Sequence, residues 1–284
     1  MIQDICIAGA GTMGSGIALA AALGGVDVIV YDTNELVIEK AKAAVKANLG
    51  FLLEKKKVSE AEHARLVESI RFSTSIDQCR AGLVIEAIVE IASVKAALFN
   101  QLAAINAADT ILASNTSSLS ITAIQSQVAN PGRVAGMHFF NPAHIMKLVE
   151  VVSGEQTSKE TTDALMQVCA RMNKTAVLCK DSPGFIVNRV ARHYYLEAMK
   201  LVEDGIAGFE NVDAIMEASG FKMGPFKLMD LIGMDINLAV SQSLYDAFAQ
   251  ELRFKPSALQ QEKVALGELG KKTGKGFYSY NTGG

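Results

Sequence analysis

A glycine-rich turn between an apolar strand and an alanine-rich helix constrains the fold of this chain more than any other feature. Residues 5–20 read ICIAGAGTMGSGIALA. Gly9 allows the sharp turn out of the strand, Gly11 lets a pyrophosphate approach the backbone, and Gly14 lets the helix pack close to the strand. Free N–H groups and the positive end of the helix dipole then face the phosphates. The turn therefore has the dinucleotide-binding pattern in its proper strand, turn and helix setting.

A second apolar run, residues 26–31, ends at Asp32. This acid lies about 20 residues beyond the glycine motif, where a carboxylate binds the ribose hydroxyls of an adenosine. Because a carboxylate there repels a 2′-phosphate, we expect NAD(H) in preference to NADP(H). Thr12 and Met13 lie inside the turn and are expected to line the same cofactor site. The alternative is a purely structural turn, since glycine turns are common in α/β proteins.

The composition excludes several classes of function. Half of the 284 residues are hydrophobic, a fifth are charged, and the net charge is −3. A chain of this kind forms a well-packed globular protein and has no electrostatic reason to bind nucleic acid or a membrane surface. No apolar run is long enough to span a bilayer. The first strand begins at Ile2, so we expect no cleavable leader.

The four cysteines show no CxxC spacing. They are typical of buried or incidental thiols in a reducing cytoplasm, so we expect neither disulfides nor zinc. The histidines show no metal-ligand spacing either, and no metal is predicted. The chain is therefore expected to be a cytoplasmic protein.

Strand and helix patterns alternate through the first two thirds of the chain, which predicts a Rossmann-type, doubly wound and mostly parallel sheet. The further strands are expected near residues 82–86, 110–114, 133–142, 147–152 and 175–179, and the helices near residues 34–57, 60–68, 93–105 and 158–172. Ligands bind beyond the carboxyl ends of the strands in such sheets. Ser117 and His138 follow strands in this way and are candidates for the site.

The character of the sequence changes at residues 181–184, which read DSPG. Asp181 or Ser182 can cap a helix, and Pro183 suits its first turn. Only helical patterns follow, near residues 185–203, 210–218, 225–248 and 256–266. We therefore expect an NAD-binding domain over residues 1–182 and an all-helical domain for substrate binding and dimerisation over residues 183–284. The apolar faces of the helical domain can form its own core and also a partner surface, and a homodimer is the expected assembly.

Lysines cover the outer face of the helix predicted over residues 34–57. They are either a solvated basic face or a clamp for a substrate that carries phosphate. Asn48 and Lys55 are seven residues apart and would share one face of this helix.

His138 differs from the other three histidines because it follows an apolar strand and precedes the residues FFNP. It is either a structural histidine or the group that removes a proton as hydride leaves an alcohol. Glu150 lies inside the apolar run 148–152, where an unpaired charge would be costly. A buried partner such as His138 explains that position, and a carboxylate could hold the tautomer of the imidazole and stabilise its charged form.

Six motifs resemble the L-3-hydroxyacyl-CoA dehydrogenase family over essentially the whole chain. They are SNTSSL at 114–119, HFFNP at 138–142, KLVEVV at 147–152, DSPGFIVNR at 181–189, MGPF at 223–226 and KKTGKGFY at 271–278. The resemblance implies NAD-dependent interconversion of (S)-3-hydroxyacyl-CoA and 3-oxoacyl-CoA in fatty acid metabolism. The length of the chain resembles that of bacterial members that act on 3-hydroxybutyryl-CoA and acetoacetyl-CoA.

The resemblance also implies roles for individual residues. His138 resembles the catalytic base and Glu150 its carboxylate partner, while Ser117 and Asn188 resemble the polar pair that binds the reacting oxygens of the substrate. Asp32, Glu90 and Lys95 resemble cofactor contacts, and Lys55 resembles a CoA-binding lysine. The other candidate positions are Gly9, Gly11, Thr12, Met13, Gly14 and Asn115 for the cofactor, and Asn48 and Asn141 for the acyl-CoA. The family has a serine where this chain has Asn48.

Two other functions remain open on the sequence alone. One is a dehydrogenase of a free hydroxy acid or sugar acid on the same fold. The other is a non-catalytic relative that only binds NAD, although the presence of His138, Glu150, Ser117 and Asn188 argues against it.

Overall fold

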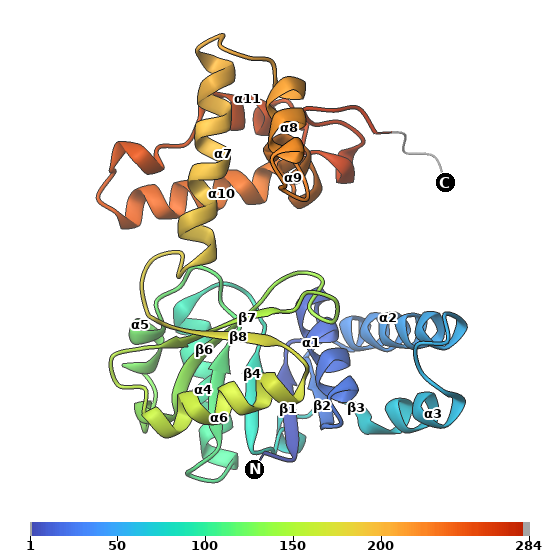
Figure 1. Cartoon of the computed structure of the whole chain (residues 1–284). Coiled ribbons are helices and arrows are strands. Elements are labelled where there is room, and N and C mark those ends of the chain that lie inside the picture. The colour runs from blue at the N-terminus through green and yellow to red at the C-terminus, as the bar shows by residue number, and fades with distance from the viewer. Residues whose placement is uncertain (1, 281–284) are drawn as a thin grey trace. The chain divides into compact units, whose positions relative to one another are not determined.

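The computed structural model of the protein describes residues 2–280. The chain divides into two compact units, one ending at Ser182 and the other beginning at Pro183. The first unit contains a large sheet with helices on its faces, and the second is built from helices joined by loops (Figure 1).

The sheet of the first unit has eight strands. They are β1 (Asp4–Ala8), β2 (Asp27–Tyr31), β3 (Ile70–Ser73), β4 (Leu83–Glu86), β5 (Ile111–Ser114), β6 (Val134–Phe139), β7 (Leu148–Ser153) and β8 (Thr175–Lys180). Their order is β3-β2-β1-β4-β5-β6-β7-β8, and every neighbouring pair is parallel except β6 with β7. The predicted mostly parallel, doubly wound sheet is confirmed. The chain order reverses at β1, so the crevice for a ligand opens at the carboxyl ends of β1 and β4.

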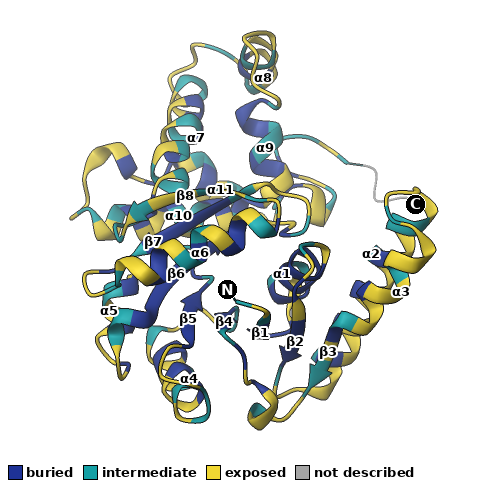
Figure 2. Ribbon diagram, turned by 60° about the horizontal axis from the view of Figure 1, so that its bottom comes forward, coloured by how far each residue is buried: buried dark blue, intermediate teal, exposed yellow. Residues whose placement is uncertain are grey.

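Two layers of helices cover the sheet because successive strand residues point to opposite faces. Ile5 and Ile7 of β1 belong to the core on one face, and Cys6 belongs to the core on the other. The first core is covered by α1 (Thr12–Leu23), α2 (Glu35–Glu54), α3 (Glu60–Ser69) and α6 (Lys159–Arg171), and the second by α4 (Ala92–Ile105) and α5 (Ile121–Gln125). Figure 2 shows the strands mostly buried and the outer faces of α2 and α3 exposed.

The second unit has its own core around Met199, Phe226 and Met229. Its helices are α7 (Val187–Glu203), α8 (Phe209–Ala218), α9 (Pro225–Ile232), α10 (Met234–Ala247) and α11 (Ala258–Ala265). The fully buried Asp230 accepts hydrogen bonds from the Phe277 N–H and the Tyr280 hydroxyl, at 3.0 Å each. This carboxylate therefore holds the KKTGKGFY segment against the end of α9.

The helical unit departs from the predicted pattern at two places. The single helix expected over residues 225–248 is two helices, because Gly233 has a φ of +106° and ends α9. The helix expected from Pro183 begins only at Val187, and its N-cap is Ile186. Asp181 does not cap it. Its carboxylate accepts from the Ser120 hydroxyl at 2.7 Å and from a backbone N–H in the first turn of α5 at 2.8 Å.

The sequence analysis did not predict two short elements of the first unit. Strand β3 has four residues and α5 has five, so neither is long enough to establish a hydrophobic period. In α2, Ile38 and Leu49 are buried, whereas Ala44 is exposed. Lys55 is the C-cap of α2, the helix that carries Asn48, and its N–H still bonds to the Phe51 carbonyl at 3.0 Å.

Candidate functional site

The three glycines of the turn after β1 meet different surroundings. Gly9 has a φ of +110°, and a Cβ there would lie 2.5 Å from the carbonyl oxygen of Ala87. A Cβ at Gly14 would lie 1.8 Å from the carbonyl oxygen of Gly9, whereas a Cβ at Gly11 would meet nothing within 4 Å. The fold itself thus requires Gly9 and Gly14, while Gly11 leaves open space at the start of α1. That space suits a bound pyrophosphate.

Asp32 is fixed beside this turn. One carboxylate oxygen accepts from the Ala10 N–H and the other from the Asn34 N–H, at 3.0 Å each. The carboxylate and the turn line a cavity of about 530 Å³ whose other walls are mostly apolar. Those walls include Tyr31, Ala87, Ile88, Val89, Val94, Ala97 and Leu98. A carboxylate beside an apolar slot fits the ribose and base of an adenosine, so the residues present fit the predicted cofactor.

A buried histidine and a buried glutamate face each other across β6 and β7. The antiparallel register pairs His138 with Glu150, and the Nδ1 of His138 lies 2.7 Å from the Oε2 of Glu150. The two residues are 6% and 1% exposed, so water screens their contact weakly. The Phe140 ring packs against the imidazole, with the centroids 4.5 Å apart. The contact expected from the position of Glu150 is present, in a geometry that a general base with an orienting carboxylate requires.

The loop after β5 carries Ser117 and is held by Glu90. One oxygen of the Glu90 carboxylate accepts from the Thr116 hydroxyl, and also from the Ser117 N–H and the Ser118 hydroxyl at 3.2 Å each. The other oxygen lies 3.1 Å from the Lys95 ammonium. Burial would raise the pKa of Glu90, but Lys95 and the donors from the loop outweigh it and lower that pKa. The Glu90 carboxylate therefore stays ionised and holds the loop.

Asn115 belongs to the same loop. Its side-chain oxygen accepts from the N–H of Phe139 at 2.9 Å, next to His138 in β6. The loop after β5 is thus tied both to Glu90 and to the strand that carries the histidine.

Sequence reasoning missed Glu86, the last residue of β4, which is completely buried. Its carboxylate accepts from the Ser114 hydroxyl at 2.7 Å, from the Ile88 N–H at 2.7 Å and from the Lys95 ammonium at 2.6 Å. An acid inside an apolar run singled out Glu150, and residues 83–89, which read LVIEAIV, place Glu86 in the same pattern. That pattern could have identified Glu86.

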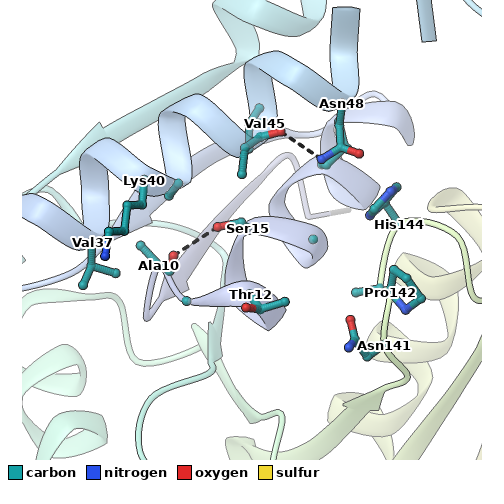
Figure 3. A pocket seen from close by; sticks show the side chains of 16 residues that line it. Ala10, Thr12, Ser15, Val37, Lys40, Val45, Asn48, Asn141, Pro142 and His144 are labelled. Carbon is teal, nitrogen blue, oxygen red and sulfur yellow. Dashed lines mark hydrogen bonds between the residues drawn. The ribbon is translucent and has the colours of Figure 1, made fainter. Parts of the chain in front are cut away.

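A second cavity, of about 330 Å³, lies between α1, α2 and the loop that follows β6. Figure 3 shows Lys40 and Asn48 on α2 at one side, and Asn141, Pro142 and His144 on the loop at the other. Thr12, at the start of α1, also lines it.

Lys40 belongs to the lysine face that the sequence offered as a clamp for a substrate with phosphate, whereas His144 was not predicted for a site. Burial and the Lys174 ammonium lower the pKa of His144, so its imidazole is neutral at pH 7. The second cavity therefore has mostly apolar walls, with neutral polar side chains at its sides and the Lys40 ammonium from α2 as its cationic group.

The remaining predicted residues lie as follows. Met13 is partly buried against the core under α1. Asn188 is the second residue of α7, in the helical unit. Lys55 lies near Glu54, with 3.7 Å between the charged groups, and over the ring of Phe51.

Residues 2–280 contain no group of three or more His, Cys, Asp or Glu side chains that could hold a metal ion. Within the same range, no helix is long and apolar enough to cross a membrane.

Comparisons with known proteins cover both units. Residues 4–182 match the model of the 3-hydroxyacyl-CoA dehydrogenase NAD binding domain, and residues 184–280 match the model of the C-terminal domain of the same family. The 3-hydroxyadipyl-CoA dehydrogenase of Escherichia coli is 46% identical over 98% of this chain, although the chain spans only 59% of that protein. A "Probable 3-hydroxybutyryl-CoA dehydrogenase" of Deinococcus radiodurans is 40% identical over 96% of this chain and 99% of its own length.

Solved structures agree with the family models. The crystal structure of (S)-3-hydroxybutyryl-CoA dehydrogenase from Ralstonia eutropha has a TM-score of 0.95 and 39% identity, and covers 99% of this chain and 100% of its own. These findings confirm the predicted family and the predicted cofactor, NAD. The chain therefore belongs to the 3-hydroxyacyl-CoA dehydrogenase family of NAD-dependent oxidoreductases.

Proposed function

We propose that this protein interconverts (S)-3-hydroxyacyl-CoA and 3-oxoacyl-CoA, with 3-hydroxybutyryl-CoA and acetoacetyl-CoA as its preferred pair. The observation that carries the proposal is the buried contact of 2.7 Å between His138 and Glu150. This contact lies in the same unit as the glycine turn and Asp32. A base with an orienting carboxylate, in the domain that binds NAD, is what oxidation of an alcohol needs.

Each residue has a defined part in the proposed mechanism. NAD, when bound, supplies a hydride acceptor. His138 takes the proton of the 3-hydroxyl group, and the Glu150 carboxylate stabilises the imidazolium that results. In the reverse direction His138 returns the proton to the oxygen of the substrate. Ser117 and Asn188 are assigned by family resemblance to bind that oxygen.

The second cavity supports an acyl-CoA substrate. CoA is a long ligand that carries phosphate, so it needs an extended groove with cationic residues near it. The cavity beside α2 is lined by Asn48 and Asn141 and carries the Lys40 ammonium, while Lys55 lies at the end of the same helix. We therefore assign Asn48, Lys55 and Asn141 to CoA binding, with Lys40 as an additional cation.

We propose different roles for the two units. The unit that ends at Ser182 binds NAD and supplies the base. The helical unit contributes Asn188 and carries the surface for a homodimer. Exposed apolar side chains on its helices, such as Val190 and Ile236, are consistent with such a surface.

The proposal predicts a strong preference for the CoA thioester. With NADH present, the protein should reduce acetoacetyl-CoA at least ~100-fold more efficiently, in kcat/KM, than free acetoacetate, because binding energy from CoA lowers the barrier to the chemical step. The measurement is the loss of NADH absorbance with each substrate. Equal efficiencies would favour a dehydrogenase of free hydroxy acids, and no oxidation with either substrate would favour a non-catalytic NAD-binding protein.

One comparison supports a different acyl group on the substrate, because the Escherichia coli relative is named for 3-hydroxyadipyl-CoA. The same assay with 3-oxoadipyl-CoA and with longer 3-oxoacyl-CoA thioesters separates these candidates. The proposal expects the highest kcat/KM with acetoacetyl-CoA. A higher value with 3-oxoadipyl-CoA would assign the protein to the dicarboxylic acyl group instead.

Asp32 provides a separate test of the cofactor site. The Asp32→Ala variant should bind NADH at least ~10-fold more weakly, because the carboxylate that would bind the ribose hydroxyls is lost. NADH fluorescence titration measures this change. The variant should also discriminate less between NADH and NADPH, since the charge that repels the 2′-phosphate is gone. Unchanged affinity for NADH would remove Asp32 from the site.

A further inference from the structure

We propose that Glu86 is a positioning residue for the dehydrogenase reaction: through Lys95 it fixes the Glu90 carboxylate, which holds the backbone of Ser117. This inference rests on the function proposed above. Glu86 would touch neither substrate nor cofactor, because its side chain is completely buried at the end of β4. Its effect would reach the reaction only through the residues that it holds.

The carboxylate of Glu86 joins three separate segments. Its Oε1 accepts from the Ile88 N–H at 2.7 Å, in the wall of the cavity that suits adenosine. Its Oε2 accepts from the hydroxyl of Ser114, the last residue of β5, at 2.7 Å. Its third partner is Lys95 of α4. One buried anion thus connects the cofactor side of the first unit to the strand that leads into the Ser117 loop.

Lys95 transmits this connection because two carboxylates share its ammonium. The Nζ lies 2.6 Å from Glu86 and 3.1 Å from Glu90, and only 1% of the side chain is exposed. A lysine this deeply buried is costly unless carboxylates compensate its charge. Family resemblance assigned Lys95 to the cofactor. Its burial instead indicates that Lys95 acts through Glu90.

Glu90 is the residue through which these contacts reach the Ser117 loop. Three donors from residues 116–118 converge on its Oε1, and one of them is the N–H of Ser117. The Glu90 side chain is 39% exposed, so its place depends on its partners and not on packing alone. Lys95 holds one oxygen of this carboxylate and the loop holds the other.

The consequence of neutralising Glu86 follows from these distances. In Glu86→Gln, the amide can still accept from Ile88 and contact Ser114, so the wall of the cofactor cavity keeps its hydrogen bonds. The Lys95 charge then has only Glu90 to compensate it, and a charged pair shortens below 3.1 Å when it can. We expect Glu90 to move toward Lys95 and to release the N–H of Ser117.

The first experiment separates binding from turnover. For Glu86→Gln we expect kcat for acetoacetyl-CoA reduction to fall about 10-fold and the Kd for NADH to change less than about 3-fold. Asp4→Asn is the matched control. Asp4 accepts from the Gly82 N–H where β1 and β4 begin, whereas Glu86 lies where β4 ends. It should lower thermal stability without lowering kcat. A kcat of Glu86→Gln within about 2-fold of wild type would overturn the proposal, as would an equal loss in Asp4→Asn.

A second pair of variants applies even if Glu86→Gln does not fold. Thr116→Ser keeps the hydroxyl that bonds to Glu90, whereas Thr116→Val removes it at nearly constant volume. The proposal expects a kcat near wild type for Thr116→Ser and a loss of about 10-fold or more for Thr116→Val. Equal kcat values in the two variants would overturn it. A failure of the proposed function would look different, because the wild-type protein itself would then not reduce acetoacetyl-CoA.

Discussion

Replacing His138 with glutamine is expected to lower kcat for acetoacetyl-CoA reduction about 100-fold or more, while NADH still binds. Glutamine is close to histidine in size and can still donate a hydrogen bond to Glu150, but it cannot take up or release a proton near pH 7. The buried Glu150 carboxylate therefore keeps a partner, and we expect the thermal unfolding temperature to change by only a few degrees. The measurements are steady-state kinetics, NADH fluorescence titration and thermal unfolding.

Two further variants make this prediction specific. Glu150→Gln should also lower kcat, because the neutral amide no longer stabilises the imidazolium, but His138 remains available and the loss should be smaller. His63→Gln, in α3, is the matched control, since the sequence and the structure give His63 no part in the site. Its kinetics should equal those of wild type. If His138→Gln retained kcat near wild type, the proton would be transferred by another group.

The sheet could be predicted because its cause is local. Apolar strands alternate with helices, and the glycine turn fixes the first strand and the first helix of the dinucleotide-binding pattern. The break at Gly233 was missed for a different reason. A single glycine inside a helical pattern costs only about 1 kcal/mol, so the pattern from 225 to 248 did not require a break. The backbone at Gly233 has a positive φ, which the sequence does not reveal.

In the candidate site, too, a local sequence signal could be predicted, whereas contacts between distant segments could not. Glu150 could be identified because a charge inside an apolar strand needs a partner, and His138 was the partner expected. Lys95 could not be recognised as buried from sequence, because its burial depends on Glu86 and Glu90 approaching it from β4 and from the following loop. The Ser117 loop depends on Glu90 in the same way. Such contacts between segments are set by tertiary packing, which leaves no periodic pattern in the chain.

Substitutions at the glycines of the turn after β1 are the second prediction with a large effect. Gly14→Ala should destabilise the fold, whereas Gly11→Ala should weaken only the binding of NADH. A Cβ at Gly14 would lie 1.8 Å from the carbonyl oxygen of Gly9, which is backbone and can move only with the turn. Gly14→Ala should therefore lower the free energy of unfolding by about 3 kcal/mol. Denaturant unfolding measures this loss.

Gly11→Ala should behave in the opposite way. Its φ is −65°, which alanine adopts without strain, and a Cβ there meets no atom within 4 Å. We expect the free energy of unfolding to stay within about 0.5 kcal/mol of wild type. NADH affinity should nevertheless fall about 10-fold or more, because the methyl group would occupy the space that the pyrophosphate needs. Titration of the folded variant with NADH measures this loss.

Gly50→Ala is the matched control for both variants. Gly50 lies in α2, and a Cβ there also meets nothing within 4 Å. Since alanine favours a helix over glycine by about 1 kcal/mol, this variant should be slightly more stable than wild type and should bind NADH equally well. If Gly11→Ala bound NADH as tightly as Gly50→Ala does, the pyrophosphate would not lie against Gly11. The cofactor would then have to cross the sheet by a path other than the turn after β1.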